Sequence, residues 1–376
     1  MRFLALILAL LPYAASLAQP VPAPTLTARS WILMDYATGQ VLASQEADTR
    51  LEPASLTKVM TTYLVADALA QKTLTLQQPV TVSERAWRTQ GSRSFVPVNK
   101  GVSVDELFKG MVIQSGNDAS VALAEAIGGT EDAFAAMMNR TAQRMGLKDT
   151  NFLNASGYFE GPAPTHYSTA RDLAKMAAAL IRDHPETHAL HATKEYTYNG
   201  IRQHNRNRLL WADPTVDGLK TGHSSAAGFC LIATAKRGPR RLISVVLGTA
   251  SEEARARDSL NLLNWGFTGF DAVKLYDKGQ AISQLKVFKG AQNMVKAGFA
   301  EDFVVSVPRG SADKLSVQLV SQQPLIAPVA AGAVIGTLKL AVAGQAWGEY
   351  PVVAQEAVPV AGLLGRLWDD IRLFFQ

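Results

Sequence analysis

Cysteine is nearly absent from the 376-residue sequence, and dense runs of basic residues are missing altogether. The single cysteine, Cys230, excludes an internal disulfide, and the apolar run GFCLIATA around it predicts a buried, inert thiol. No cluster of His, Cys, Asp and Glu has the spacing of metal ligands, so we expect neither a metal nor a cofactor. The net charge of +5 comes without interleaved aromatic and basic residues, which leaves nucleic-acid binding unsupported.

Long hydrophobic runs are also scarce. The N-terminal run FLALILALL, behind Arg2, is too short for a spanning helix and is typical of a secretory signal peptide. Small residues at Ser16 and Ala18 predict cleavage after Ala18, which would remove residues 1–18; an uncleaved membrane anchor is the alternative. Export would place the rest of the chain outside the cytoplasm. With 48% apolar residues, this remainder can build the cores of two or three domains.

The stretch PASLTK, residues 53–58, puts Ser55 three positions before Lys58. Proline favours the first turn of a helix, so the Lys58 amine should lie one turn above the Ser55 hydroxyl. A serine becomes a good nucleophile when a base takes its proton, and a partly desolvated lysine near other cations can do so. The same spacing occurs twice more, at Ser283/Lys286 and Ser311/Lys314. This motif alone is therefore weak, because solvated side chains are its ordinary interpretation.

Two further motifs follow in order. Ser115-Gly116-Asn117 begins 60 positions after Ser55, and Lys220-Thr221-Gly222 is the only K-[ST]-G in the chain. With this set the sequence closely resembles the low-molecular-mass penicillin-binding proteins of the serine-type D-alanyl-D-alanine carboxypeptidase family. The resemblance runs from about Ser30 to the C-terminus and includes YSTARDLA (167–174), NGIRQHNRN (199–207), VDGLKTGH (216–223) and LLNWGF (262–267).

The resemblance implies a mechanism on a peptidoglycan stem peptide that ends in D-Ala-D-Ala. Ser55 would attack the penultimate carbonyl, Lys58 would act as general base, and Ser115 would relay a proton to the departing D-alanine. Asn117 would hold the substrate amide, and the charge of Lys220 would lower the pKa of Lys58 and favour anionic groups. β-Lactam antibiotics would acylate the same serine.

The resemblance also implies further substrate-binding residues. Backbone N–H groups of Ser55 and His223 would hold the oxyanion, and Gly222 lies in the same segment. A free terminal carboxylate needs a partner, for which Thr221 and Arg255 are the candidates, since a guanidinium matches a carboxylate with two parallel hydrogen bonds. Arg257 is an alternative to Arg255, because a shift of two residues would put it at the same family position. Arg206 also matches a family position, but we can derive no role for it.

One segment departs from the family pattern. Residues 151–166 carry Ser156-Gly157 where relatives often have a histidine, so the rate of deacylation is the property that this change would affect. A class A β-lactamase shares the three motifs, but it needs a glutamate in an E-x-x-x-N context; Glu160 lacks this context, and Ser-Gly-Asn replaces Ser-Asp-Asn. An endopeptidase that cuts cross-links and a catalytically silent envelope scaffold stay open as alternatives.

The coarse pattern predicts an α+β transpeptidase/β-lactamase-like domain over residues 28–270, an antiparallel sheet with a helical cluster. A hairpin is expected at 30–45 and strands at 228–235 and 241–250. Because KTG immediately precedes these strands, Lys220 should lie on or beside an edge strand. Helices are expected at 103–114, from Asn117, at 130–145, from 168 or 169 to 181, and at 252–266.

In the last hundred residues the sequence pattern changes from helical segments to short alternating runs. Short alternating runs over 271–358 predict a small all-β domain, for which the resemblance implies a stalk and a plain packing domain is the alternative. Residues 360–376 place Val360, Leu363, Trp368 and other apolar residues on one helical stripe, with two arginines and two aspartates largely outside it. We expect an amphipathic helix that attaches the exported protein peripherally to the periplasmic face of the inner membrane. A helix docked on its own domain is the alternative.

Overall fold

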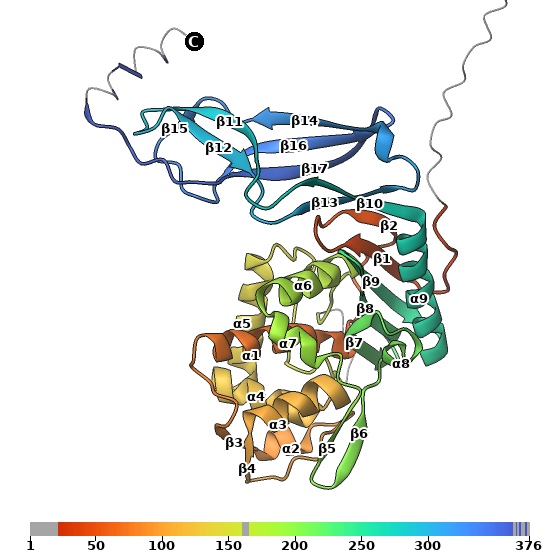
Figure 1. Cartoon of the computed structure of the whole chain (residues 1–376). Coiled ribbons are helices and arrows are strands. Elements are labelled where there is room, and N and C mark those ends of the chain that lie inside the picture. Colours follow the sequence, from red (N-terminus) through yellow and green to blue (C-terminus); the bar gives the residue numbers. More distant parts are fainter. Residues whose placement is uncertain (1–21, 160–164, 364–365, 367, 370–372, 374–376) are drawn as a thin grey trace, which may run out of the picture. The chain divides into compact units, whose positions relative to one another are not determined.

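The computed structural model describes residues 22–159, 165–363, 366, 368–369 and 373. The predicted signal peptide, residues 1–18, lies outside this part. Contacts divide the described chain into a larger unit, Ala23–Gln280 with Phe299–Ser306, and a smaller unit, Ala281–Gly298 with the residues from Val307 onward. Figure 1 shows both units in the colours of the sequence.

An antiparallel sheet forms the frame of the larger unit, and among the described residues its strand order is β2-β1-β9-β8-β7. The strands are β1 (Ser30–Asp35), β2 (Val41–Gln45), β7 (Val216–Ser224), β8 (Gly228–Arg237) and β9 (Arg240–Thr249). The predicted hairpin and the two predicted strands are therefore present. β7 is an edge strand, which confirms the position expected for Lys220.

Both faces of this sheet are buried because its apolar residues alternate between two cores. Ile32, Cys230 and Val245 face a core that includes helices α1 (Lys58–Ala70) and α6 (Ala170–Asp183). Leu33 and Val246 face the opposite core, which α9 (Glu252–Gly269) covers. Burial raises the pKa of the Cys230 thiol to about 11, as expected for an inert cysteine.

The helical cluster follows the predicted order, except that one predicted helix is divided and three short helices are added. The other helices are η1 (Ala54–Thr57), α2 (Glu84–Arg88), α3 (Val104–Lys109), η2 (Gly110–Gln114), α4 (Asn117–Gly128), α5 (Glu131–Arg144), α7 (Pro185–Leu190) and α8 (Leu209–Ala212). The segment predicted as one helix at 103–114 changes at Gly110 into a π-helical turn, η2, which ends at left-handed Ser115. The short helices α2, α7 and α8 were not predicted, because four to six residues are too few to show a periodic pattern.

Side-chain caps start five of the described helices. Ser103 Oγ caps α3 by accepting a hydrogen bond from the backbone N–H of Glu106 (3.3 Å). Ser83, Thr130, Thr169 and Ser251 cap α2, α5, α6 and α9 in the same way. Each helix therefore begins at a residue that satisfies one of its free N–H groups.

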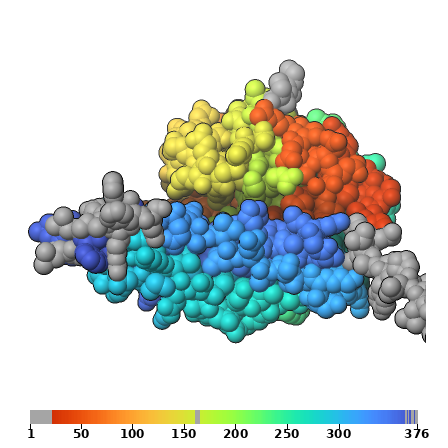
Figure 2. All heavy atoms as spheres, turned by 90° about the horizontal axis from the view of Figure 1, so that it is seen from above, coloured from red at the N-terminus to blue at the C-terminus, as the bar shows by residue number. Residues whose placement is uncertain are grey.

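Ion pairs join the segment after β2 to the helical block. Arg50 pairs with Asp149 (2.7 Å) and Arg171 with Asp48 (2.7 Å). In Figure 2 these parts of the larger unit adjoin as red-orange and yellow spheres. Because all four side chains are at least partly exposed, these pairs contribute little stability each, about 0–1 kcal/mol, and mainly fix the register of the contact.

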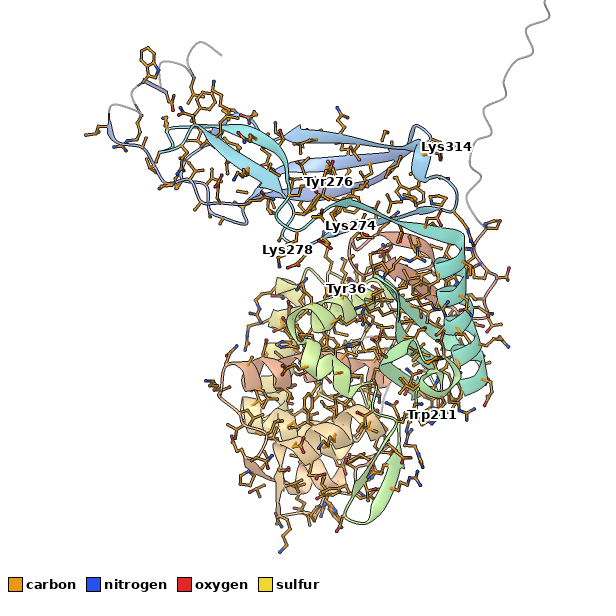
Figure 3. The ribbon with its side chains drawn as sticks, viewed as in Figure 1. Tyr36, Trp211, Lys274, Tyr276, Lys278 and Lys314 are labelled. Atoms are coloured by element: carbon orange, nitrogen blue, oxygen red, sulfur yellow. The ribbon has the colours of Figure 1, made fainter. Side chains whose placement is uncertain are left out.

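Small two-stranded sheets complete the larger unit. They are β3–β4 (Pro79–Thr81 with Gly101–Ser103), β5–β6 (Glu195–Tyr198 with Ile201–His204) and β10–β13 (Phe270–Tyr276 with Phe303–Pro308). Tyr276, labelled in Figure 3, has its ring 6.0 Å from that of Phe299 and 6.5 Å from that of Phe303. These aromatic contacts explain why residues 299–306 belong to the larger unit although a strand of the smaller unit precedes them in the chain.

The smaller unit is all-β, as predicted. Its described strands have the order β14-β16-β17-β12-β11-β15, in which only β15 pairs parallel with its neighbour. They are β11 (Ala281–Phe288), β12 (Met294–Gly298), β14 (Leu315–Ser321), β15 (Leu325–Ile326), β16 (Val334–Val342) and β17 (Gln345–Ala354). Alternate residues such as Val295, Leu338 and Val352 are buried, as expected for a sheet with one covered face.

The end of the chain is described only in part. Residues 363, 366, 368, 369 and 373 are helical, and the backbone N–H of Lys289 donates to Asp369 Oδ2 (2.6 Å). A continuous amphipathic helix over 360–376 is not shown by these positions. None of the helices in the described part of the chain is both long and apolar enough to cross a membrane.

Candidate active site

The nucleophile turn is built as the spacing of PASLTK predicted. Pro53 precedes a short 3₁₀ turn that runs directly into α1, and Lys58 Nζ donates to Ser55 Oγ over 2.9 Å. Ala54 adopts a left-handed conformation (φ 45°), which is uncommon for a residue with a Cβ. This local strain at the residue before the nucleophile is the kind that persists only where surrounding contacts impose it.

Lys58 is fully buried and lies at the centre of the site. Besides Ser55, its Nζ donates to Asn117 Oδ1 (2.7 Å) and to the carbonyl oxygen of Ser156 (2.7 Å). Burial, with a further contribution from the charge of Arg206, lowers the pKa of Lys58 to about 7, while Asp118 opposes this shift. The amine is therefore neutral in a large fraction of molecules near pH 7 and can accept a proton from Ser55.

The two other Ser-x-x-Lys motifs, Ser283/Lys286 and Ser311/Lys314, lack this geometry. Ser283 and Lys286 lie on strand β11, where residues three apart point to opposite faces of the sheet. Ser311 precedes a three-residue 3₁₀ turn that ends at Lys314. Only the serine and lysine of 53–58 stand at the start of a long helix, which is what brings the two side chains together.

Lys220 lies on edge strand β7 and is also buried. Its pKa is lowered by burial first, then by the charges of Lys58, Arg206 and Arg255. The repulsion between the two buried amines acts on both, because one buried positive charge makes a second one nearby unfavourable. At Lys58 the largest cause of the lowered pKa is burial.

A close approach holds β7 against the nucleophile turn. A Cβ added at Gly222 would lie 2.9 Å from the carbonyl oxygen of Pro53 and 3.3 Å from the amide nitrogen of Leu56. Glycine therefore allows the strand to pass beside the turn that carries Ser55. This is a physical reason for glycine in the third position of KTG.

The Ser115–Asn117 segment enters the same cleft from the helical side. Ser115 is left-handed (φ 69°), and its buried Oγ has no hydrogen-bond partner among the described residues. Asn117 is engaged at both ends, because its Oδ1 accepts from Lys58 and its Nδ2 donates to the carbonyl oxygen of Gln90 (2.6 Å). In this state Asn117 positions Lys58, and its Nδ2 carries a second N–H that can donate to a substrate amide.

A loop that the motifs did not reveal supplies the third acceptor for Lys58. Asn154 Oδ1 accepts from the N–H groups of Ser156 (3.1 Å) and Gly157 (2.7 Å), which turns the Ser156 carbonyl toward the amine. Gly157 has φ 76°, and a Cβ there would lie 1.8 Å from the carbonyl oxygen of Ala54. Glu160, the residue that the β-lactamase alternative needs, lies outside the described residues.

A buried histidine fastens this loop to the nucleophile helix. His166 Nδ1 accepts from the N–H of Leu153 (3.1 Å), so Nε2–H donates to Thr57 Oγ1 (2.8 Å). Burial lowers the pKa of His166 to about 4, which keeps the ring neutral near pH 7. Sequence reasoning missed this residue, because Thr57 and His166 are 109 positions apart and share no motif.

Arg255, rather than its register rival Arg257, faces the cleft. Arg255 is buried, donates to the carbonyl oxygen of Gly222 (3.3 Å) and pairs with Glu252 (3.4 Å). Arg257 is largely exposed and pairs with Asp258. Arg206 is exposed at the cleft and makes no hydrogen bond or ion pair with another residue of the described chain.

These elements enclose a cleft of about 690 Å³. His223 lines it from β7, with its ring stacked on Phe229 at 4.0 Å between centroids. Lys58 and Lys220 lie beneath its surface. The other predicted site residues that line it are Ser55, Ser115, Asn117, Thr221, Gly222 and Arg255. The structure therefore brings together every predicted site residue around one crevice.

The D-alanyl-D-alanine carboxypeptidase family profile matches residues 17–251. This chain belongs to that family. The C-terminal domain of penicillin-binding protein 5 matches residues 270–360. Among its relatives in this carboxypeptidase family, D-alanyl-D-alanine carboxypeptidase DacC of Escherichia coli is 42% identical over 97% of this chain and 92% of its own length. DacA of Haemophilus influenzae is 40% identical over 94% of this chain and 91% of its own.

Solved structures of carboxypeptidase-family relatives agree with this assignment. Penicillin-binding protein 5 of Haemophilus influenzae has a TM-score of 0.81 and 40% identity, and the match covers 90% of this chain and 99% of that one. Penicillin-binding protein D2 of Listeria monocytogenes, solved in an ampicillin-bound form, has a TM-score of 0.61 and 31% identity, over 66% of this chain and 100% of its own. The fold of a penicillin-binding α/β domain followed by an all-β domain is therefore established.

The close packing of Gly157 on the nucleophile turn gives a testable prediction. In Gly157→Ala the new methyl group would collide with the Ala54 carbonyl, so the loop must move and the Ser156 carbonyl must leave Lys58. Loss of a hydrogen bond to a charged group costs about 1.5–3 kcal/mol, so we expect labelling of Ser55 by a fluorescent penicillin to slow by about tenfold or more.

Gly146→Ala is the matched control. Gly146 has a similar φ of 69°, but nothing lies within 4 Å of the position that its Cβ would take. Both variants carry the backbone strain of a left-handed alanine, about 1–2 kcal/mol, and only Gly157→Ala carries the collision. Equal labelling rates in the two variants, after both have been checked for similar melting temperatures, would contradict the role of the loop.

Proposed function

We propose that this protein removes the terminal D-alanine from peptidoglycan stem peptides through a serine acyl-enzyme and that β-lactams acylate the same serine. The observation that carries the proposal is the Lys58 amine, buried and with a lowered pKa, 2.9 Å from Ser55 Oγ at the floor of an open cleft. Family membership supplies the expected substrate, and this geometry supplies a means of activating the serine.

Acylation begins when Ser55 Oγ attacks the penultimate carbonyl and Lys58 accepts its proton. The developing oxyanion would be held by the backbone N–H groups of Ser55 and His223, by family analogy. Each such donor stabilises the transition state by about 3 kcal/mol. The neutral form of Lys58 is required for this step, so a pKa of about 7 suits catalysis near neutrality.

Release of D-alanine requires a proton for its amine and a partner for its carboxylate. Ser115 is suited to the proton relay, because its buried hydroxyl has no partner in the described structure and lines the cleft. Arg255 and Thr221 line the same wall, where a guanidinium and a hydroxyl can hold the free carboxylate. Water then hydrolyses the acyl-enzyme, and Ser55 regains its proton.

Arg206 has a role in this scheme that the sequence did not provide. Its exposed guanidinium contributes to the low pKa of both Lys58 and Lys220. We therefore assign it to the electrostatics of the general base. For the class A β-lactamase alternative, Glu160 lacks the E-x-x-x-N context, and Ser-Gly-Asn stands where that class has Ser-Asp-Asn.

The direct test is release of D-alanine from a synthetic stem pentapeptide. Wild-type protein should release D-alanine and become covalently labelled by penicillin, and Ser55→Ala should abolish both. Ser283→Ala, which alters another Ser-x-x-Lys motif, should leave release and labelling unchanged. Persistent release or labelling in Ser55→Ala would refute the nucleophile, and labelling without release by the wild type would favour a silent scaffold.

We also propose that the protein is exported, loses residues 1–18 and attaches peripherally to the periplasmic face of the inner membrane through residues 360–376. Two observations support the attachment. Leu363 and Trp368 have 71% and 59% of their surface exposed, and they lie on the apolar stripe of the sequence. Because two arginines and two aspartates in this segment cancel, apolar burial rather than attraction to anionic lipid would dominate.

Vesicle sedimentation tests the attachment. We expect the protein without residues 1–18 to sediment with vesicles of neutral and of anionic lipid alike, and the double variant Leu363→Ser/Trp368→Ser to lose most of this binding. Trp211→Ser, which changes another exposed tryptophan (48%) on α8 (Figure 3), is the control and should bind normally. Unchanged binding of the double variant would favour a helix docked on its own domain.

A further inference from the structure

A buried histidine holds the strand that carries Lys220. His191 immediately follows α7, which lies beside β7 in Figure 1, and it is completely buried. Its Nδ1 lies 2.9 Å from the carbonyl oxygen of Leu219, the residue before Lys220. Because a carbonyl oxygen only accepts hydrogen bonds, Nδ1 carries the proton and donates. His191 does not line the cleft, and none of the steps proposed for the reaction uses it.

The tautomer that makes this hydrogen bond leaves the other ring nitrogen unsatisfied. Nε2 of His191 is then an acceptor, and it is buried without a hydrogen-bond partner among the described residues. An unpaired buried acceptor costs free energy, which a wholly apolar side chain at this position would avoid. In the described chain, the hydrogen bond to Leu219 is the contact of the ring that offsets this cost. The presence of a histidine here is therefore explained by what it does for β7.

The main chain of His191 is connected to the cleft by a second route. Asn205 Nδ2 donates to the carbonyl oxygen of His191 (3.1 Å), and Asn205 Oδ1 accepts from the N–H of Asn207 (2.9 Å). Asn207 Nδ2 donates in turn to the carbonyl oxygen of Gly218 on β7 (3.0 Å). Arg206, which lines the cleft, lies between these two buried asparagines in the chain. The same network therefore holds the backbone of Arg206 and the first half of β7.

Two cations near the general base depend on this network. It fixes the carbonyl groups of both residues that precede Lys220, and it flanks Arg206 on each side. The charge of Arg206 lowers the pKa of Lys58 against the opposing effect of Asp118, and the amines of Lys58 and Lys220 repel each other. Moving either cation away from Lys58 would therefore raise the pKa of the base.

His191 acts without a charge of its own. Burial is the main cause of its pKa being lowered to about 3; the charges of His188 and Lys220 act in the same direction, and the hydrogen bond to Leu219 opposes them. The ring is therefore neutral throughout the range, around pH 7, in which Lys58 changes its charge. A change in the pH dependence of the reaction on replacement of His191 would thus report geometry and not titration of the ring.

We propose that His191 is a positioning residue, which holds Lys220 and Arg206 in fixed places around Lys58 through its ring and its main chain. Because it does not line the cleft, it acts through these side chains and not on the substrate. The inference rests on the proposed function, since it concerns the base that activates Ser55. It concerns a contact across 28 positions that none of the three motifs includes.

The pH dependence of acylation by a penicillin tests this role. His191→Leu and His191→Phe both remove the donor, and the second retains an aromatic ring. In both variants we expect the midpoint of the rate constant to move to higher pH by about half a unit or more, because Lys220 and Arg206 are no longer held near Lys58. Rate constants do not depend on the fraction of the protein that folds, so a loss of stability alone cannot produce this shift.

His191→Asn is the conservative variant. Its amide N–H stands at the δ position, as His191 Nδ1 does, so it can donate to the carbonyl oxygen of Leu219. The smaller side chain leaves a cavity in the core, and we expect a lower melting temperature for this reason. The midpoint of the acylation rate should nevertheless equal that of the wild type.

His184→Phe is the matched control, since His184 Nε2 makes a hydrogen bond of the same length (2.9 Å) to Asp67 at the other end of α7. It should lower the melting temperature and leave the midpoint unchanged. The proposal is overturned if His191→Leu and His191→Phe keep the wild-type midpoint, or if His191→Asn or His184→Phe shifts it as much as they do. Failure of the proposed function gives a different result, namely no labelling of the wild type by penicillin.

Discussion

The site depends on a lysine side chain that is removed from water. Lys58 has no exposed surface, and an isolated buried ammonium is strongly disfavoured. Three oxygens, from Ser55, Asn117 and Ser156, compensate for the lost hydration by accepting from its Nζ within 2.9 Å. The balance leaves the pKa of the amine near 7 instead of 10.5, so one group can be a stable part of the core and also a base.

The strained and glycine positions around the site follow from this requirement. Left-handed Ala54 starts the turn that carries the serine, left-handed Ser115 turns the chain before Asn117, and Gly157 lets the third loop pack on the first. His166 and Thr57 join that loop to the helix from the far side. Each contact fixes one of the oxygens that Lys58 needs, and a well-packed surround is what maintains such geometry.

Sequence alone predicted the parts of the site that have local or recurring patterns. The proximity of Ser55 and Lys58 follows from helical spacing, and the set of three motifs distinguishes this pair from the two other Ser-x-x-Lys pairs. The edge position of Lys220 follows from the two strands after KTG. The Ser156 carbonyl was not predictable, because a backbone oxygen has no sequence signature. Thr57 and His166 were missed because their contact spans 109 positions without a motif. The burial of both lysines was not predictable either, since spacing says nothing about burial.

In the fold, too, the features with local patterns were predicted and those that depend on tertiary contacts were not. The hairpin at the start, the capped helices and the all-β unit were read from periodicity and turn residues. The π-helical turn before Ser115 and the assignment of residues 299–306 to the larger unit arise from tertiary contacts, such as those of Tyr276 with two phenylalanines, which local patterns do not encode.

The most direct measurement is the pH dependence of the rate at which a penicillin acylates the protein, because this step needs neutral Lys58. We expect the rate constant to rise with pH, to reach half its maximum near pH 7 and to level off above it. Replacing Arg206 with Gln should move the midpoint to higher pH, since a charge that lowers the pKa is removed. A midpoint near 10, the ordinary range of an exposed lysine, or a rate independent of pH between 5 and 9 would contradict the account.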